Sequence, residues 1–248
     1  MNYIVLDLEF NQTYDFNDGE LYAVDSRCQF EIIQIGAAKL NSNFEIIEEF
    51  NILVKPQIYK KIHPIVEKLT TLNTKSFENE QFFPNAYSSF VDFIGDEQST
   101  LCIWGPYDIK ALYKNIFFYN LSHGQLSPVF INVQSLASKF LKYPTGMSVG
   151  LKNAVETFNL VIDKPFHNAL NDAVYTAKIL EKLKEEKITT VKFNISQLDG
   201  EEEPKKEQIN TKLLYDKIEK DLGRKISKNE KRLYRNIYLL GRNKKFDV

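Results

Sequence analysis

The stretch IVLDLEF, residues 4–10, decides the fold that we expect for this chain. Side chains along a strand point alternately to opposite faces of a sheet, so Asp7 and Glu9 share one face, about 6.7 Å apart along the strand. We expect a strand this apolar to be covered on both faces, where uncompensated carboxylates cost several kcal/mol each. The pattern predicts a central strand that presents two acids to a cation site. The alternative is an edge strand with one wet face.

The composition is that of an ordinary globular protein. The 248 residues suffice for one α/β domain with an appendage or for two small domains, and they are 43% hydrophobic and 26% charged. Because the N-terminus lacks the basic and uninterrupted apolar segments of a signal peptide, and no apolar run is long enough for a membrane helix, we expect a cytoplasmic protein that does not bind membranes. Cys28 and Cys102 are too few and too far apart for a zinc site or a disulfide framework.

Charge is unevenly distributed along the chain. Residues 1–204 hold 18 Lys and Arg against 27 Asp and Glu, whereas residues 205–248 hold 14 against 6, so the two parts have net charges of −9 and +8. Residues 197–207 are polar, charged and contain Gly and Pro, which is typical of a linker. We therefore expect a domain at 1–190, a linker at 191–208 and a basic helical extension at 209–248, with helices at about 210–222 and 228–240.

The order of the remaining elements predicts the sheet. After a polar loop at 11–27, residues 30–40 and 44–54 are rich in β-branched and aromatic residues and are joined by a turn at 41–43, which indicates an antiparallel hairpin. Further strands are expected at 99–104 and 129–133, and helices at about 85–94, 109–116, 134–141, 150–158 and 168–187. An initial meander followed by alternating strands and helices predicts an α/β fold with a five-stranded mixed sheet and helices on both faces.

Three further side chains are candidates for the same site. Asp108 falls in the first turn of the helix after the 99–104 strand, where a carboxylate suits the helix dipole and could be a mere capping residue. His167 and Asp172 would lie about 140° apart on a regular helix. We therefore expect His167 just before the helix and Asp172 on the side that faces the sheet. His63 and His123 are interpreted as structural.

These residues, in this order and separation, resemble the DEDDh family of 3′–5′ exonucleases. The resemblance covers roughly residues 1–187, and the stretches LDLEFNQ, EIIQIGAAKL, GLKNAVETF and HNALNDAVYTAKIL resemble KapD-type bacterial exonucleases and the eukaryotic exonucleases that trim the 3′ ends of histone mRNA and small RNAs. The residues that carry it are Asp7, Glu9, Asp108, His167 and Asp172. It implies a ribonuclease H-like fold with strand order 3-2-1-4-5.

The resemblance also implies a reaction. Such an enzyme hydrolyses phosphodiester bonds from the 3′ end of single-stranded nucleic acid, here with RNA favoured, and releases nucleoside 5′-monophosphates. It uses two Mg²⁺ or Mn²⁺ ions. Asp7 would bridge the two ions, Glu9 and Asp172 would complete the site of the water-activating ion, and Asp108 would support the second ion. His167 would take the proton from the attacking water.

Several alternatives stay open at this point. Phe10 and Tyr107 flank the acids and could stack on the terminal bases or simply pack. A DNA-directed exonuclease and a catalytically silent RNA-binding module of the same fold are the rival functions. A phosphatase or a calcium site would not require a histidine five residues before an acid at a helix start. The sequence indicates neither the oligomeric state nor the roles of the basic extension and the loop after Asn11.

Overall fold

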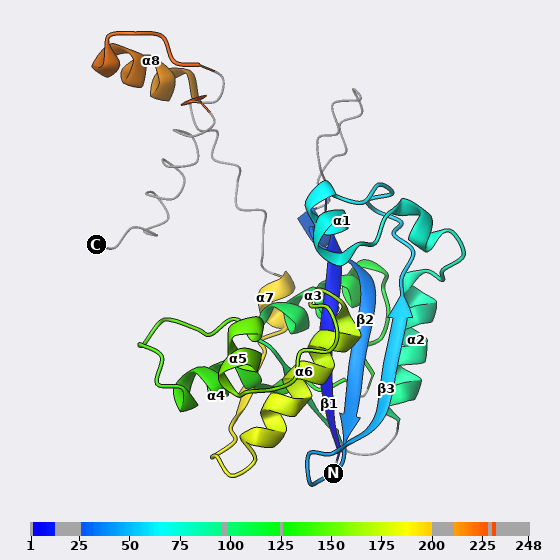
Figure 1. Ribbon diagram of the computed structural model, residues 1–248. Coiled ribbons are helices and arrows are strands. Elements are labelled where there is room, and N and C mark those ends of the chain that lie inside the picture. The colour runs from blue at the N-terminus through cyan, green and yellow to red at the C-terminus, as the bar shows by residue number, and fades with distance from the viewer. Residues whose placement is uncertain are drawn as a thin grey trace. The chain divides into compact units, whose positions relative to one another are not determined.

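The computed structural model describes residues 2–12, 26–95, 99–124, 126–199, 211–227 and 230–231. It divides the chain into two compact units, Met1–Leu198 and Asp199–Val248. The first unit contains a six-stranded sheet in the order β3-β2-β1-β4-β5-β6. Figure 1 shows β3, β2 and β1 side by side. Most of the loop expected after Asn11 lies outside the described residues.

The sheet is mixed, and its strands follow the expected order. Its first three strands are antiparallel, β4 and β5 continue from β1 in parallel, and β6 is antiparallel to β5. The strands are β1 (Asn2–Asn11), β2 (Glu31–Leu40), β3 (Ile46–Leu53), β4 (Ser99–Ile103), β5 (Val129–Asn132) and β6 (Thr190–Lys192). Asn41 stabilises the turn between β2 and β3, because its side-chain oxygen accepts hydrogen bonds from the main-chain N–H groups of Asn43 and Glu45.

Helices cover both faces of the sheet, as predicted (Figure 1). One face packs against α2 (Phe83–Ile94) and α3 (Tyr107–Phe118), and the other against α4 (Val133–Phe140), α5 (Leu151–Thr157) and α6 (Ala169–Lys182). The structure also has shorter helices: η1 (Ser26–Cys28), α1 (Pro64–Thr70), η2 (Thr74–Phe77) and α7 (Ser196–Asp199). The helix expected at 85–94 begins two residues earlier, with Pro84 in its first turn.

The side chains of β1 alternate between the two layers. Ile4, Leu6 and Leu8 are buried against α2 and α3, whereas Val5 is buried in the core beneath α6. β1 is therefore a central strand covered on both faces, and the edge-strand alternative is wrong. Asp7 shares the face of Val5, which is the face that α6 covers.

The sheet has six strands, one more than the five that we expected. β6 pairs with β5 through residues 190–192, and Phe193 then stacks on Tyr113 of α3 with a ring-centroid distance of 5.8 Å. These residues belong to the segment 191–208 that we assigned to the linker. The strand was missed because it is three residues long and its residues are exposed. The alternation of Val191, Phe193 and Ile195 with polar residues was the available signal.

The second unit contains α8 (Thr211–Leu222), which corresponds to the first helix expected in the extension. The second expected helix, at 228–240, lies outside the described residues except for 230–231, which are helical. Among the helices that the structure describes, none combines the length and the apolar character needed to cross a membrane.

Candidate active site

The two acids of β1 lie beneath the N-terminal end of α6. In the pairing of β1 with β2, Asp7 is opposite Gly36 and Glu9 is opposite Gln34. The register shifts just after Glu9, so that Phe10 pairs with Ile32. Such a bulge strengthens the local twist and redirects side chains, and bulges are frequent next to active sites. Asp7 and Glu9 are thus held on one face at the end of a buried strand.

Asp108 reaches the same region from the neighbouring strand. β4 pairs with β1 in parallel, with Ile103 opposite Leu6, so both strands end at the same edge. The chain then turns through Gly105, whose φ of +93° suits glycine, into α3. Asp108 lies in the first turn of α3 and is 7% exposed. A carboxylate whose only role was to compensate the helix dipole would gain by staying in water, so its burial indicates a further role.

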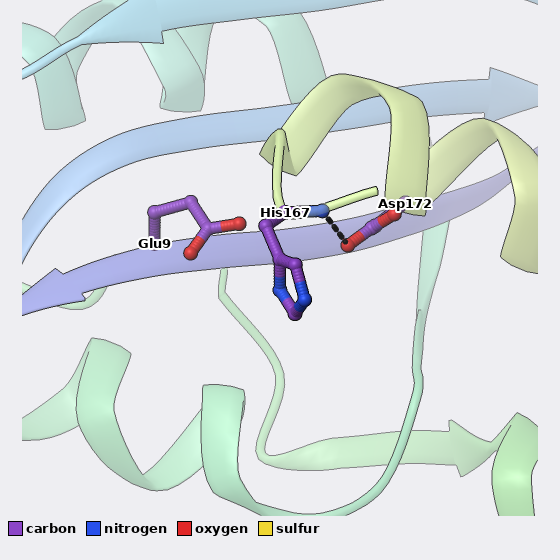
Figure 2. Close-up of side chains that lie close together, drawn as sticks. All are labelled: Glu9, His167 and Asp172. Atoms are coloured by element: carbon purple, nitrogen blue, oxygen red, sulfur yellow. Dashed lines mark hydrogen bonds between the residues drawn. The ribbon is translucent and has the colours of Figure 1, made fainter. Parts of the chain in front are cut away.

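His167 and Asp172 come from the start of α6. The helix begins at Ala169, with Asn168 as its N-cap, so His167 precedes the helix and Asp172 is in its first turn, as the spacing predicts. The main-chain N–H of His167 donates a hydrogen bond of 3.0 Å to Oδ2 of Asp172 (Figure 2). His167 has a φ of +62°, a left-handed conformation that histidine adopts more readily than most residues. Its ring takes no part in the bond to Asp172 and is exposed.

Hydrogen bonds and ring packing hold the loop that carries His167 against α6. The hydroxyl of Tyr175 donates to the carbonyl of Lys164 at 2.7 Å and accepts from the N–H of the same residue at 2.9 Å. The ring of Phe166 packs on Tyr175 with centroids 4.9 Å apart. These contacts hold the residues just before His167, although the imidazole itself faces solvent.

Three of the expected site residues form a close group. A carboxylate oxygen of Glu9, a ring nitrogen of His167 and a carboxylate oxygen of Asp172 lie within 4.8 Å of one another. Figure 2 shows Glu9 approaching from β1, His167 from the turn before α6, and Asp172 from α6 itself. Asp7 and Asp108 are not members of this group, but the charges of Glu9 and Asp172 act on both of them. The structure thus brings all five residues to one end of the sheet.

Burial raises the pKa values of all four acids, and repulsion between carboxylates raises those of Asp7, Glu9 and Asp108 further. Burial raises the pKa of Glu9 to about 8, with a further contribution from the charge of Asp172. Burial also raises the pKa of Asp108 to about 8, together with the charges of Glu9 and Asp172. The pKa of Asp7 is raised well above its usual range, by burial first and then by the charges of Asp108, Asp172 and Glu9. For Asp172, burial outweighs the hydrogen bond from His167 and raises the pKa to about 6.

The donor set fits a divalent cation. Within the described part of the chain, Oδ1 of Asp172 is buried and has no hydrogen-bond partner, while Oδ2 is occupied by the N–H of His167. A buried carboxylate oxygen without a donor is unfavourable unless a cation compensates it. Four carboxylates supply the hard oxygen ligands that Mg²⁺ and Mn²⁺ prefer. These residues could therefore hold such ions.

The two aromatic residues that we considered for base stacking differ in their surroundings. Tyr107 begins α3 next to Asp108 and is 80% exposed, so its ring is accessible. Phe10 is half-buried, lies among the residues packed on the opposite face from Glu9, and meets the ring of Phe30 edge-on at 6.3 Å. This is the environment of a packing residue. Stacking by either ring stays a prediction.

Two residues of β2 were missed by the sequence reasoning. A Cβ atom at Gly36 would lie 2.1 Å from the carbonyl carbon of Ala169, so the start of α6 rests directly on the backbone of β2. Gln34 accepts a hydrogen bond from the N–H of Ala169 at 3.2 Å. A glycine inside a strand pattern is a known sign of close backbone approach, so Gly36 could have been found. No local signal pointed to Gln34.

Comparison with known proteins identifies the family. A family model described as exonuclease matches residues 4–180. The chain belongs to this exonuclease family. This exonuclease is similar to the probable 3′–5′ exonuclease KapD of Bacillus subtilis (strain 168). The two are 22% identical over 158 residues, which cover 63% of this chain and 75% of KapD.

Two solved structures show that the fold is shared. The nuclease domain of 3′hExo, described as a DEDDh family member bound to rAMP, has a TM-score of 0.64 at 20% identity, covering 77% of this exonuclease and 97% of that domain. Exonuclease X, solved with 5′-overhanging duplex DNA, has a TM-score of 0.51 at 13% identity, covering 79% and 96%. The ribonuclease H-like fold with strands 3-2-1-4-5 is therefore confirmed, with β6 added at its edge.

Proposed function

We propose that this member of the exonuclease family is a metal-dependent 3′–5′ exonuclease. It removes nucleotides from the 3′ end of single-stranded nucleic acid and releases nucleoside 5′-monophosphates. The observation that carries the proposal is the grouping of Glu9, His167 and Asp172 within 4.8 Å beneath α6, in a chain of this family. A catalytically silent binding module of the same fold would have no use for four repelling carboxylates beside a histidine.

The acids are the proposed metal ligands. Asp7, Glu9, Asp108 and Asp172 would hold two Mg²⁺ or Mn²⁺ ions, and Oδ1 of Asp172 has no competing donor among the described residues. When bound, two such ions help to activate water and to offset charge on the attacking and leaving oxygens. Burial and, after it, the charges of neighbouring carboxylates raise the pKa values of Glu9 and Asp108, and bound cations would offset that repulsion.

His167 is the proposed general base. Its main-chain bond to Asp172 fixes the backbone and leaves the imidazole out of that interaction, at the exposed edge of the acid group. The ring would take a proton from the water whose oxygen attacks the phosphorus of the terminal phosphodiester. The bond from that phosphorus to the 3′ oxygen of the preceding nucleotide then breaks, and this oxygen takes a proton from solvent to become the new 3′-hydroxyl while the ring returns its proton to solvent. Tyr107, exposed next to Asp108, is the proposed contact for a base near the 3′ end.

We propose RNA as the preferred substrate, with DNA as the alternative. The solved relative with a TM-score of 0.64 holds rAMP, whereas the one with duplex DNA has a TM-score of 0.51. The motifs around Asp7 and His167 also resemble exonucleases that trim RNA ends. RNA is distinguished from DNA at the 2′-hydroxyl, so the preference must lie in contacts to that group.

A degradation assay with matched single strands tests this function. Single-stranded RNA and DNA of one sequence, labelled at the 5′ end, are incubated with Mg²⁺ or Mn²⁺, and the ladder and the mononucleotide products are analysed. We expect a ladder shortening from the 3′ end, faster on RNA, and none with Asp7→Asn or with EDTA. Faster loss of the DNA would select the DNA alternative, and binding without any metal-dependent loss would select the silent module.

A further inference from the structure

Gln34 is a buried amide placed between three elements of the site. It lies on β2 opposite Glu9 of β1, and it is 1% exposed. Its amide nitrogen donates to the side-chain oxygen of Asn51 on β3 at 2.8 Å, and its amide oxygen accepts from the N–H of Ala169 at 3.2 Å. Because Asn51 engages the nitrogen, the oxygen faces α6. The orientation of the Gln34 amide is therefore set by a residue on the far side of β2.

The side chain of Gln34 gives a hydrogen-bond acceptor to the main-chain N–H of Ala169, the first residue of α6. The first N–H groups of a helix have no partner within the helix and need one from elsewhere. Asn168 caps one of them, since its side-chain oxygen accepts from the N–H of Asn171 at 3.3 Å. Gln34 supplies the acceptor for another, from a position 135 residues away in the sequence. The start of α6 is thus tied to the sheet as well as to its own cap.

The contact between Gln34 and Ala169 lies between Glu9 on β1 and the first turn of α6, which carries Asp172. Glu9 is fixed to β1, whereas Asp172 is in the first turn of α6 and accepts the hydrogen bond from His167. A change in the distance between the first turn of α6 and β2 therefore moves Asp172 and His167 together, away from or toward Glu9. Gln34 contacts the helix at that turn and is the cross-strand neighbour of Glu9.

We propose that Gln34, oriented by Asn51, is a positioning residue that sets the separation of Asp172 and His167 from Glu9 and so determines how tightly the site binds a divalent cation. The inference rests on the proposed function. Folding does not depend on this hydrogen bond alone, because α6 also buries an apolar face in the core through Ala173, Ala177 and Leu180.

The test measures Mn²⁺ binding to the full chain without nucleic acid, from the loss of the free-ion electron paramagnetic resonance signal. Gln34→Met keeps the length of the side chain and removes both hydrogen bonds. We expect it to weaken Mn²⁺ binding about 10- to 100-fold, the usual effect of removing a residue that orients metal ligands. The matched control is Asn41→Ala, which removes three hydrogen bonds of the side-chain amide from the turn at the other end of β2. It should lower the melting temperature and leave the Mn²⁺ affinity unchanged.

A pair of variants at Asn51 separates positioning from general loss of stability. Asn51 is exposed, so either substitution should fold even if Gln34→Met does not. Asn51→Leu removes the acceptor that orients Gln34 and should weaken Mn²⁺ binding in the same direction as Gln34→Met. Asn51→Asp keeps an acceptor oxygen and should bind Mn²⁺ as the parent does.

Two results would overturn the inference: parental Mn²⁺ affinity in Gln34→Met, or equal affinities in Asn51→Leu and Asn51→Asp. Failure of the proposed function gives a different result. In that case Asp172→Asn would bind Mn²⁺ as tightly as the parent, or the parent would bind none, and the inference would fall with the proposed function.

Discussion

Gly36 of β2 and Ala169 of α6 are so close that a Cβ atom at Gly36 would lie 2.1 Å from the carbonyl carbon of Ala169. The atom in the way belongs to the helix backbone, so no side-chain rotation can make room. Asp7 is the cross-strand partner of Gly36, and Asp172 follows Ala169 within the same helical turn. The distance between two acids of the site thus depends on the absence of a side chain on β2.

Gly36→Ala should therefore harm both stability and activity. Added atoms in a well-packed contact typically cost about 1–3 kcal/mol, and here the relief must come from moving α6, which carries Asp172. We expect a lower urea midpoint and a large loss of exonuclease activity. The control is Gly150→Ala at the N-cap of α5, where φ is −73° and nothing lies within 4 Å of the added Cβ. Parental activity in Gly36→Ala would contradict this account of how α6 is seated.

His167→Asn should lose about 10²- to 10⁴-fold in catalytic rate, the usual contribution of a general base. Asparagine also tolerates the φ of +62°, and the bond to Asp172 comes from the main chain, so the melting temperature should stay close to that of the parent. His123→Asn is the control, since this histidine lies edge-on to Tyr113 at 5.8 Å and outside the acid group. It should keep the catalytic rate. A parental rate in His167→Asn would mean that another group takes the proton.

The metal-free protein should lose stability as the pH rises from about 4 to about 8. Glu9 and Asp108 have folded-state pKa values of about 8, against ordinary values of 4.5 and 3.8, so in this range the folded state binds more protons than the unfolded state. The stability linked to these groups is fully present below pH 4 and declines as the pH passes through the folded values. Melting temperatures in EDTA between pH 5 and pH 8 measure this slope.

Substitutions test whether the dependence of the melting temperature on pH comes from the acids of the site. Glu9→Gln and Asp108→Asn should each make the slope shallower and raise the melting temperature at pH 8, because each removes one repelling charge. The control is Glu49→Gln on the exposed surface of β3, which should leave the slope as it is. Mg²⁺ or Mn²⁺ should raise the melting temperature of the parent at pH 8 more than that of either site variant. A parent whose melting temperature is independent of pH in EDTA would contradict the electrostatic account.

Local patterns were enough to predict much of the fold. The alternation in β1, the turn at Asn41 and the helical spacings depend on neighbours in the sequence, and they indicated the central strand, the hairpin and the helices on both faces. The spacing of His167 and Asp172 likewise indicated that the histidine precedes α6. These features follow from geometry within a few residues, which a single sequence contains.

The rest depends on contacts between distant segments. The role of Gln34 arises only once α6 lies over β2, because its partner Ala169 is 135 residues away. The orientation of Phe10 away from Asp7 and Glu9 follows from its place among the residues packed on the other face. β6 has three exposed residues, so the alternation of Val191, Phe193 and Ile195 could indicate a short strand but not that it pairs with β5. Each of these depends on tertiary packing rather than on local sequence.

The basic extension leads to a last prediction. In residues 223–248, nine Lys and Arg stand against two Asp and Glu, whereas α8 has three of each. Acids near the turn after α8 are already paired: Lys225 contacts Glu219 at 2.7 Å, and Arg224 contacts Glu230 at 2.6 Å. The positive excess therefore belongs to the segment that follows α8, and we expect it to contact phosphates of the nucleic acid.

Deletion of residues 205–248 tests that expectation. Affinity for a single strand is measured at two salt concentrations with an Asp7→Asn chain in both lengths, so that the strand is not degraded. If the extension contacts phosphates, truncation weakens binding and makes the salt dependence shallower by about 0.7 in log–log slope for each lost contact. A full-length chain with Gln in place of the Lys and Arg residues of 223–248 should reproduce this change. An unchanged slope with a lowered melting temperature would instead mean that the extension serves the stability of the fold.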